Sequence, residues 1–353
     1  MFEMDLSNEE LLHIIELFFD DIPYKFEIKN TSRGESDFRE AIILEWKSGE
    51  KYVIKLSDND FTFADKIKSW KRCAEEYRKL GYYCPNILYS KNGDFPTVAY
   101  KGHSCVAYVE EFSKYRIVDE RTDENSDYYT KPNKEYMNEA FVMTARIAAE
   151  RLDFTDYPSG YCLFESFCPS DKTDEVLENA LEWKKYADTL PAEFQLQVQR
   201  IWHRWNENRT QLEQLYFDLP TSVFQADLNA TNILLDDNGK FVGIFDFNLC
   251  GKDVLLNYLF REICWYSDRD EEINYILDTL KNISKFYYFS DIEKRAAPLL
   301  YRCLKPLWFS EIEKLKKAGY DTKAIKNCLD ETEKLQTKVI DFETYMSNAA
   351  ILK

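Results

Sequence analysis

The sequence predicts an α+β protein with two lobes: a small N-terminal lobe built on an antiparallel sheet, and a large helical C-terminal lobe. The chain has 353 residues, which exceeds the size at which a single hydrophobic core usually keeps growing and therefore favours two lobes. Strand-like runs dominate the first third of the chain, and long patterns of helical period dominate the rest. We expect the lobes to be residues 1–112 and 113–353.

The N-terminal lobe is predicted to contain strands and two helices. Ser7 is a candidate N-cap for a first helix over residues 7–20, with Glu10 completing a capping box. A turn signal at residues 47–50 joins the second and third strands into a hairpin, and apolar side chains at helical spacing predict a second helix over residues 63–80. The predicted strands are residues 25–30, 39–46, 50–57, 96–102 and 104–112.

The C-terminal lobe is predicted to be mainly helical. Residues 135–152 and 192–217 are amphipathic at a period of 3.6 residues, and much of 271–349 follows the same pattern.

Composition narrows the classes of partner. The net charge of −17 repels phosphate backbones and anionic lipids, so we expect neither nucleic acid nor a membrane as a partner, and a cationic ligand fits it as well as a plain acidic surface does. The N-terminus lacks the features of a secretory signal, and no run of 18 apolar residues occurs. Nine scattered cysteines without a C-x-x-C pair indicate reduced, buried thiols. We expect a cytoplasmic protein.

Residues 224–248, FQADLNATNILLDDNGKFVGIFDFN, predict a β-hairpin with polar residues at its open end. Asn238-Gly239 lies between two apolar runs, and both residues tolerate the positive φ of a type I′ turn. With these two residues as the loop, Asn232 lies opposite Phe245 and one step from Asp246; a register shifted by one residue places Asn232 directly opposite Asp246. In either register the hairpin brings Asn232 and Asp246 to the same end.

The residue types at this end favour phosphoryl transfer. A carboxylate and a carboxamide oxygen form a hard, oxygen-only site, which suits Mg²⁺ together with phosphate oxygens and water. Asp227 precedes Asn232 by five residues and is near enough to accept a proton from a nucleophile. The alternative is a surface hairpin that is merely capped by polar residues.

This stretch resembles the catalytic core of the aminoglycoside phosphotransferase and choline kinase family, whose fold is similar to that of protein kinases. That core has the pattern His-Gly-Asp-x4-Asn, then a strand, a turn and a strand that ends in Asp-Phe or Asp-Trp. The resemblance implies that Asp227 is the catalytic base and that Asn232 and Asp246 bind Mg²⁺. Gln225 and Ala226 replace the usual His-Gly, which puts the efficiency of the enzyme in question.

The same resemblance implies a nucleotide site in the N-terminal lobe, for ATP or GTP. Lys55 occupies the position of the cation that holds the α- and β-phosphates, although a solvated strand lysine is the alternative. The next helix should offer a carboxylate to Lys55, either Glu75 or Glu76, of which we prefer Glu76. Further implied nucleotide contacts are Ser36, in the loop that covers the phosphates, and the backbone of the linker from Glu110 to Phe112.

Three functions remain open from the sequence. The first is a Mg²⁺-dependent kinase that phosphorylates a small, cationic alcohol, such as an aminoglycoside or a metabolite of the choline or homoserine type. The second is a nucleotide-binding protein with weak or no catalysis, which the missing His-Gly favours. The third, a protein kinase, is disfavoured because no activation segment ending in Ala-Pro-Glu follows Asp246. The sequence does not specify an oligomeric state.

Overall fold

The chain divides into two units in the computed structural model, which describes residues 2–3, 9–34, 36–118, 134–264 and 268–347. The first unit contains Met1–Glu120, Cys168–Ser170 and Asp227–Gly251, and the second contains Arg121–Phe167, Asp171–Ala226 and Lys252–Lys353. The segment of the predicted hairpin therefore groups with the N-terminal residues, although it lies far along the chain. The expected lobes, residues 1–112 and 113–353, stay a prediction.

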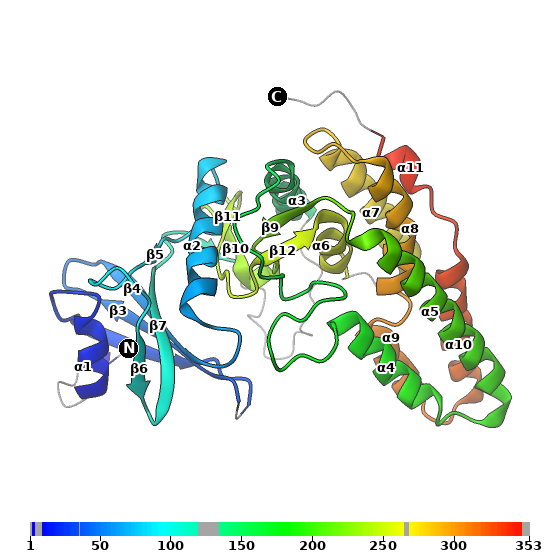
Figure 1. Cartoon of the computed structure of the whole chain (residues 1–353), viewed down its shortest axis with the longest axis horizontal. Coiled ribbons are helices and arrows are strands. Elements are labelled where there is room, and N and C mark those ends of the chain that lie inside the picture. The colour runs from blue at the N-terminus through cyan, green and yellow to red at the C-terminus, as the bar shows by residue number, and fades with distance from the viewer. Residues whose placement is uncertain (1, 4–8, 35, 119–133, 265–267, 348–353) are drawn as a thin grey trace. The chain divides into compact units, whose positions relative to one another are not determined.

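The first unit is built on antiparallel sheets (Figure 1). A seven-stranded sheet has the order β1-β2-β3-β4-β7-β5, with β6 paired to β7, and a three-stranded sheet has the order β11-β10-β8. The elements are β1 (Phe2–Glu3), α1 (Glu9–Glu16), β2 (Lys25–Asn30), β3 (Phe38–Glu45), β4 (Lys51–Asp58), α2 (Ala64–Lys79), β5 (Ile87–Leu88), β6 (Thr97–Tyr100), β7 (His103–Glu111), β8 (Arg116–Ile117), the 3-10 turn η2 (Ala230–Asn232), β10 (Ile233–Leu235) and β11 (Phe241–Ile244).

The five predicted strands and both predicted helices of this region are present, with ends that differ by a few residues. The first helix begins at Glu9, and the proposed N-cap Ser7 lies outside the described residues. The second helix covers Ala64–Lys79, and the chain leaves it through Gly81 at φ +90°, a conformation that glycine adopts without a steric cost.

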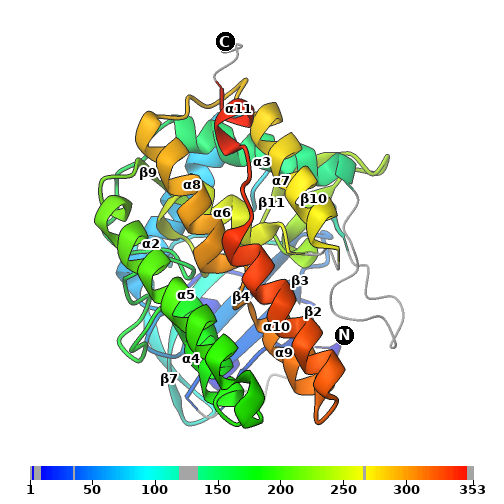
Figure 2. The ribbon, with the colours of Figure 1, turned by 90° about the vertical axis from the view of Figure 1, so that its right-hand side faces the viewer.

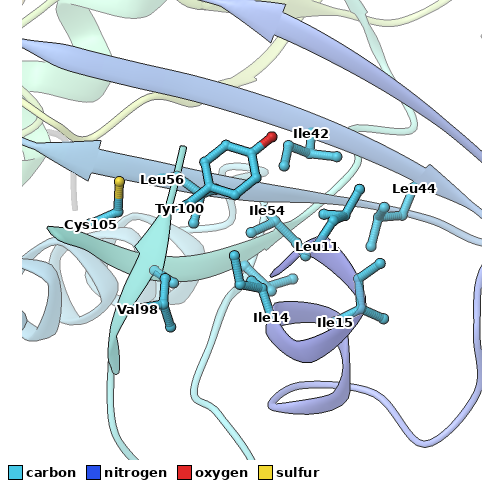
Figure 3. Close-up of a cluster of buried hydrophobic side chains, with 12 residues drawn as sticks. Leu11, Ile14, Ile15, Ile42, Leu44, Ile54, Leu56, Val98, Tyr100 and Cys105 are labelled. Atoms are coloured by element: carbon cyan, nitrogen blue, oxygen red, sulfur yellow. The ribbon is translucent and has the colours of Figure 1, made fainter. Parts of the chain in front are cut away.

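One face of the seven-stranded sheet packs against α1 to form an apolar core. Figure 3 shows Leu11, Ile14 and Ile15 of α1 beside Leu44 and Ile54 of the sheet, and all five side chains are at most 1% exposed. Apolar residues at positions i, i+3 and i+4 of a helix lie on the same side, which explains why α1 buries this stripe. Truncating one such side chain to Ala typically costs about 2–5 kcal/mol.

The second unit is mainly helical (Figure 2). Its long helix α5 packs against α8 and α10, and two side chains tie α5 to α8: Trp205 Nε1 donates to the carbonyl of Cys303 at 2.9 Å, and Asn208 Nδ2 donates to that of Leu299 at 2.8 Å. The elements are α3 (Lys134–Ala149), α4 (Glu175–Ala187), η1 (Ala192–Phe194), α5 (Gln195–Tyr216), β9 (Thr221–Phe224), β12 (Gly251–Val254), α6 (Leu255–Glu262), α7 (Arg269–Ile283), α8 (Asp291–Leu304), α9 (Phe309–Ala318), α10 (Thr322–Thr337) and α11 (Phe342–Tyr345).

The nine cysteines are all free thiols, as the sequence predicts, and seven of them are buried. Within the described residues, no helix combines the length and the apolar character that a membrane span requires.

Candidate active site

Lys55 lies in β4, an interior strand, on the face of the sheet opposite the apolar core. It pairs with Ala41 of β3 and Tyr108 of β7, whereas the core contains their neighbours Ile42 and Ile54. Because successive side chains of a strand point to opposite faces, Lys55 is directed away from the core. Its side chain is only 19% exposed, so it is not the solvated strand lysine that the sequence left open.

Two carboxylates bind the Lys55 ammonium group. Lys55 Nζ lies 3.1 Å from Glu110 Oε2 and 3.1 Å from Asp246 Oδ1. Burial alone would lower the pKa of Lys55, but the negative charges of Asp246 and Glu110 raise it well above its ordinary value. Burial raises the pKa of Glu110, and the positive charge of Lys55 offsets part of this rise. The result is a buried, charged cation held between a strand of the sheet and the segment that follows the hairpin.

The hairpin has the predicted register at its open end but a different turn. Ile233 pairs with Ile244, and the Phe245 N–H donates to the Asn232 carbonyl at 3.1 Å, so Asn232 lies opposite Phe245. The predicted type I′ turn is wrong: Gly239 has φ +79°, but Asn238 is not among the residues with positive φ.

The loop is one residue longer than predicted. The Asp236 N–H donates to the Lys240 carbonyl, and the Gly239 N–H donates to the Asp236 carbonyl, both at 2.9 Å. These bonds close a loop of residues 237–239 with glycine in the left-handed region at its end, a common hairpin loop that carries a bulge. A register shift between Leu234 and Leu235 then restores the predicted pairing.

A loop of the first unit fixes β11 through a close backbone approach at Gly243. The Tyr83 N–H donates to the Val242 carbonyl at 2.8 Å, and the Ile244 N–H donates to the Tyr83 carbonyl at 3.1 Å. A Cβ atom at Gly243 would lie 1.8 Å from the Tyr83 carbonyl oxygen, so only glycine fits here. This contact positions the end of β11, which leads directly to Asp246.

Asp227 and Asn232 are hydrogen-bonded to each other within the loop before β10. Asn232 Nδ2 donates to Asp227 Oδ2 at 2.9 Å and to the Asp227 carbonyl at 3.2 Å. Burial, together with the negative charge of Asp246, raises the pKa of Asp227 to about 6. A carboxylate whose pKa lies this near neutrality is suited to accept a proton from a hydroxyl group.

Asn232 and Asp246 fit the chemistry of a magnesium site. The bonds from Nδ2 of Asn232 orient its amide, and no hydrogen bond to its Oδ1 is found within the described residues. The donor set is one carboxamide and one carboxylate, and no group of three or more His, Cys, Asp or Glu that could hold a metal occurs in the described part of the chain. Mg²⁺ is commonly held by one or two protein oxygens plus phosphate and water, so these two residues fit that ion.

Two residues of this segment have unusual backbone conformations. Ala226 has φ +70° and Asp246 has φ +59°, in the left-handed region that disfavours residues other than glycine. Ala226 stands where the related pattern has glycine. Gln225, in the position of the usual His, is fully buried, and its Oε1 accepts a hydrogen bond from the Tyr258 hydroxyl at 3.4 Å.

The remaining predicted residues lie in different settings. Glu76 binds Lys79 at 2.8 Å, and no ion pair between Glu76 and Lys55 is found among the described residues. Ser36 is exposed in the turn before β3, and Phe112 is 42% exposed and donates its N–H to the Lys51 carbonyl at 3.2 Å. The structure therefore gives Lys55 a different partner from the expected one.

Sequence reasoning missed the side chain of Glu110 as the partner of Lys55, since it assigned Glu110 only a backbone contact. Glu110 belongs to strand β7, where Tyr108 and Glu110 face the same side as Lys55. The sequence contained a signal for this contact. Once the pairing of β4 with β7 is known, Tyr108 lies opposite Lys55, and Glu110, two residues further on, brings its carboxylate within reach of the lysine.

Comparisons with known proteins give a consistent family and fold. A sequence model of the phosphotransferase enzyme family (APH) matches residues 33–257. Among solved structures, the chain is similar to an amicoumacin kinase in complex with AMP-PNP, Ca²⁺ and "Ami", with 15% identity, 96% of this chain and 97% of that chain covered, and a TM-score of 0.55. No curated protein matches the chain in sequence.

Two further solved structures share the fold. A microcompartment-associated aminopropanol kinase is 12% identical over 99% of each chain with a TM-score of 0.51. An aminoglycoside phosphotransferase from Alicyclobacillus acidocaldarius is 11% identical over 95% of this chain and 94% of that chain with a TM-score of 0.50. These likenesses confirm the predicted α+β, kinase-like fold, with an antiparallel sheet in the N-terminal region and helices in the C-terminal part.

Proposed function

Because the chain belongs to the phosphotransferase enzyme family, we propose that it transfers the γ-phosphate of ATP or GTP to a hydroxyl group of a small, amine-bearing molecule such as an aminoglycoside. The observation that carries this proposal is the grouping of a buried lysine, three carboxylates and an amide within one unit. Lys55 contacts Asp246 and Glu110, and Asp227 accepts a hydrogen bond from Asn232.

Each of these side chains has a role in the proposed reaction. Lys55 attracts the α- and β-phosphates, and Asp227 accepts the proton that the acceptor hydroxyl loses as its oxygen bonds to the γ-phosphorus. The bond from the γ-phosphorus to the β,γ-bridging oxygen breaks in the same step, and ADP or GDP leaves. A general base of this kind contributes about 10²- to 10⁴-fold to the rate. Asn232 holds the Asp227 carboxylate through its Nδ2 hydrogen bond. A Mg²⁺ ion held by Asn232 and Asp246 would supply positive charge that stabilises the transferred phosphoryl group.

The choice of acceptor rests on charge and on the related structures. The net charge of −17 attracts cations to the protein. Similar structures include kinases described as acting on aminopropanol, a small amino alcohol, and on aminoglycosides. Metabolites of the choline or homoserine type remain alternative acceptors.

A second candidate function is nucleotide binding with weak or no catalysis. Gln225 replaces the usual His, and Ala226 adopts a φ of +70° where the related pattern has glycine. Both departures immediately precede Asp227, so they affect the base rather than the nucleotide site.

A crossed ligand screen tests the proposal. The melting temperature of the full chain is measured with Mg-ATP or Mg-GTP, alone and with aminoglycosides, amino alcohols, choline or homoserine, and each mixture is assayed for a phosphorylated acceptor. We expect one nucleotide to raise the melting temperature only with Mg²⁺, and one acceptor class to gain a phosphate. Nucleotide binding without any product would favour the second candidate, and no response to any nucleotide would contradict both.

A further inference from the structure

A second cation, Arg39, lies on the same sheet face as Lys55. Arg39 of β3 pairs with Ser57 of β4, and Ala41 of β3 pairs with Lys55, so Arg39 and Ala41 are two residues apart. Residues directly opposite one another in an antiparallel pair share a face, as do residues two apart in a strand. Arg39 therefore points to the Lys55 side of the sheet, away from the apolar core that contains Ile42.

Arg39 is held in place with hydrogen-bonding capacity to spare. Its Nη2 donates to Asp37 Oδ2 at 2.8 Å, and Asn59 Nδ2 donates to Asp37 Oδ1 at 2.9 Å, which fixes the carboxylate. The Arg39 side chain is 13% exposed, and its buried Nε has no hydrogen-bond partner within the described residues. A guanidinium group has five N–H donors; with Nε buried and one Nη2 donor bound to Asp37, the two donors of Nη1 and the second of Nη2 remain for a ligand.

The strand pairing shows where Arg39 lies along the sheet relative to Lys55 and the linker. On β4, Val53 pairs with Glu110 and Lys55 pairs with Tyr108, whereas Ser57 pairs with Arg39 on its other side. The linker after β7 thus lies at one end of this face, Lys55 in the middle, and Arg39 toward the turn between β2 and β3. A nucleotide with its base at the linker and its first phosphates at Lys55 extends its remaining phosphates toward Arg39.

We propose that Arg39 binds the terminal phosphates of the nucleoside triphosphate and makes the site selective for ATP or GTP over nucleosides and monophosphates. The inference rests on the proposed function, because it assumes that a nucleotide lies on the Lys55 face. Arginine suits this role because its planar fork binds two phosphate oxygens at once, whereas lysine binds as a point charge. Asp37 keeps the fork oriented before the nucleotide arrives.

Calorimetric titration tests this assignment in the full-length protein. Arg39→Met, Arg39→Lys and wild type are titrated with Mg-ATP, Mg-ADP and adenosine. Losing hydrogen bonds between charged groups weakens binding by roughly tenfold or more. We expect Arg39→Met to bind Mg-ATP with that tenfold or greater loss of affinity, and Arg39→Lys to lose less. The affinity of Arg39→Met for adenosine should stay within about twofold of wild type, which also shows that this variant is folded. Arg295→Met, an exposed arginine of helix α8 in the second unit, is the matched control and should bind as wild type does.

The outcomes separate this inference from the proposed function. Wild type that binds neither nucleotide overturns the proposed function. Wild type that binds Mg-ATP, while Arg39→Met binds it equally well, overturns only the assignment of Arg39. Equal losses for adenosine and Mg-ATP in a folded variant show that Arg39 has a purely structural role, and they overturn the assignment too.

Discussion

Ala226, which precedes the hairpin, and Asp246, which follows it, share the left-handed backbone conformation. Their φ angles are +70° and +59°, and this region costs an L-residue other than glycine about 1–2 kcal/mol. Such strain persists where the surroundings fix the chain, and it is concentrated at functional sites. Ala226 directly precedes Asp227, and Asp246 contacts Lys55. We infer that the strain helps to aim both carboxylates.

The strain at Ala226 predicts an unusual response to glycine. Ala226 is fully buried, and Ala→Gly at a buried site normally destabilises. At Ala226, however, glycine relieves a φ strain of about 1–2 kcal/mol, and this relief should offset the destabilisation. In urea unfolding, Ala226→Gly should therefore cost at least about 1 kcal/mol less than Ala145→Gly, which removes an equally buried methyl group from helix α3 of the same unit. Equal costs would show that Ala226 is not strained.

Removing Lys55 should destabilise the fold as well as the nucleotide site. Lys55→Met leaves the carboxylate of Glu110, which is 7% exposed, without its cation, and breaking a buried pair costs about 3 kcal/mol or more. The double variant Lys55→Met/Glu110→Gln should recover most of this free energy of unfolding but not nucleotide affinity. Chemical unfolding and nucleotide titration of wild type, Lys55→Met, Glu110→Gln and the double variant provide the test. A double variant as unstable as the single one would show that the ion pair is not the cause.

The sequence allowed three candidate site residues to be named because their relation is local. Asp227, Asn232 and Asp246 lie on one hairpin and its flanks, so spacing and a turn signal suffice to group them. Glu110 was assigned only a backbone role, because its meeting with Lys55 depends on the pairing of β4 with β7, two strands far apart in the chain. Glu76 was preferred instead, because the family resemblance implies a carboxylate from the helix that follows Lys55.

At the scale of elements, the hairpin keeps its predicted register through two irregularities that cancel. The loop is one residue longer than predicted, and the shift between Leu234 and Leu235 returns the strands to the pairing of Ile233 with Ile244. Both hairpin loops that fit Asn-Gly place glycine at positive φ, so the dipeptide does not distinguish them. The open end was predictable because the Asn-Gly signal locates the loop to within one residue, and either register brings Asn232 and Asp246 to the same end.

Gly243 should be the position where the hairpin is most sensitive to an added methyl group. Gly243→Ala places a Cβ atom 1.8 Å from the Tyr83 carbonyl oxygen, so β11 must separate from that loop. We expect a loss of about 3 kcal/mol or more in the free energy of unfolding and a marked loss of nucleotide affinity, because Asp246 follows β11.

The matched control for this variant is Gly49→Ala in the turn between β3 and β4. Gly49 has φ +90° with nothing within 4 Å of the added atom, so the substitution should cost only about 1 kcal/mol and leave nucleotide affinity unchanged. Similar effects of the two substitutions would mean that the close approach to Tyr83 does not position the site.

At the scale of the whole molecule, the candidate nucleotide residues all lie in the first unit. Lys55 and Glu110 come from the N-terminal sheet, and Asp227, Asn232 and Asp246 come from the segment that groups with it. The sequence did not reveal this grouping, because it depends on contacts between distant segments: the ion pair of Lys55 with Asp246, the approach of Tyr83 to β11 and the pairing of β8 with β10. Short strands such as β5, β8, β9 and β12 were also missed, since two to four residues carry little periodic signal.

This grouping predicts where a nucleotide will protect the backbone. In hydrogen exchange of the full chain, Mg-ATP should slow exchange mainly in β3, β4, β7 and residues 227–251, with little direct effect on α5, α8 and α10. Hydrogen exchange measured with the acceptor but without nucleotide is the reference for protection outside these segments. Protection confined to the helices of the second unit would contradict the assignment of the nucleotide site.

The central claim is that Asp227 is the base of a phosphoryl-transfer site, and one substitution tests it most directly. With an acceptor identified, Asp227→Asn should lower the turnover number by about 10²- to 10⁴-fold while Mg-nucleotide affinity is retained. Asp237→Asn, the same chemical change at an exposed position of the hairpin loop, should leave both quantities unchanged. Turnover of Asp227→Asn close to that of the wild type would contradict the account.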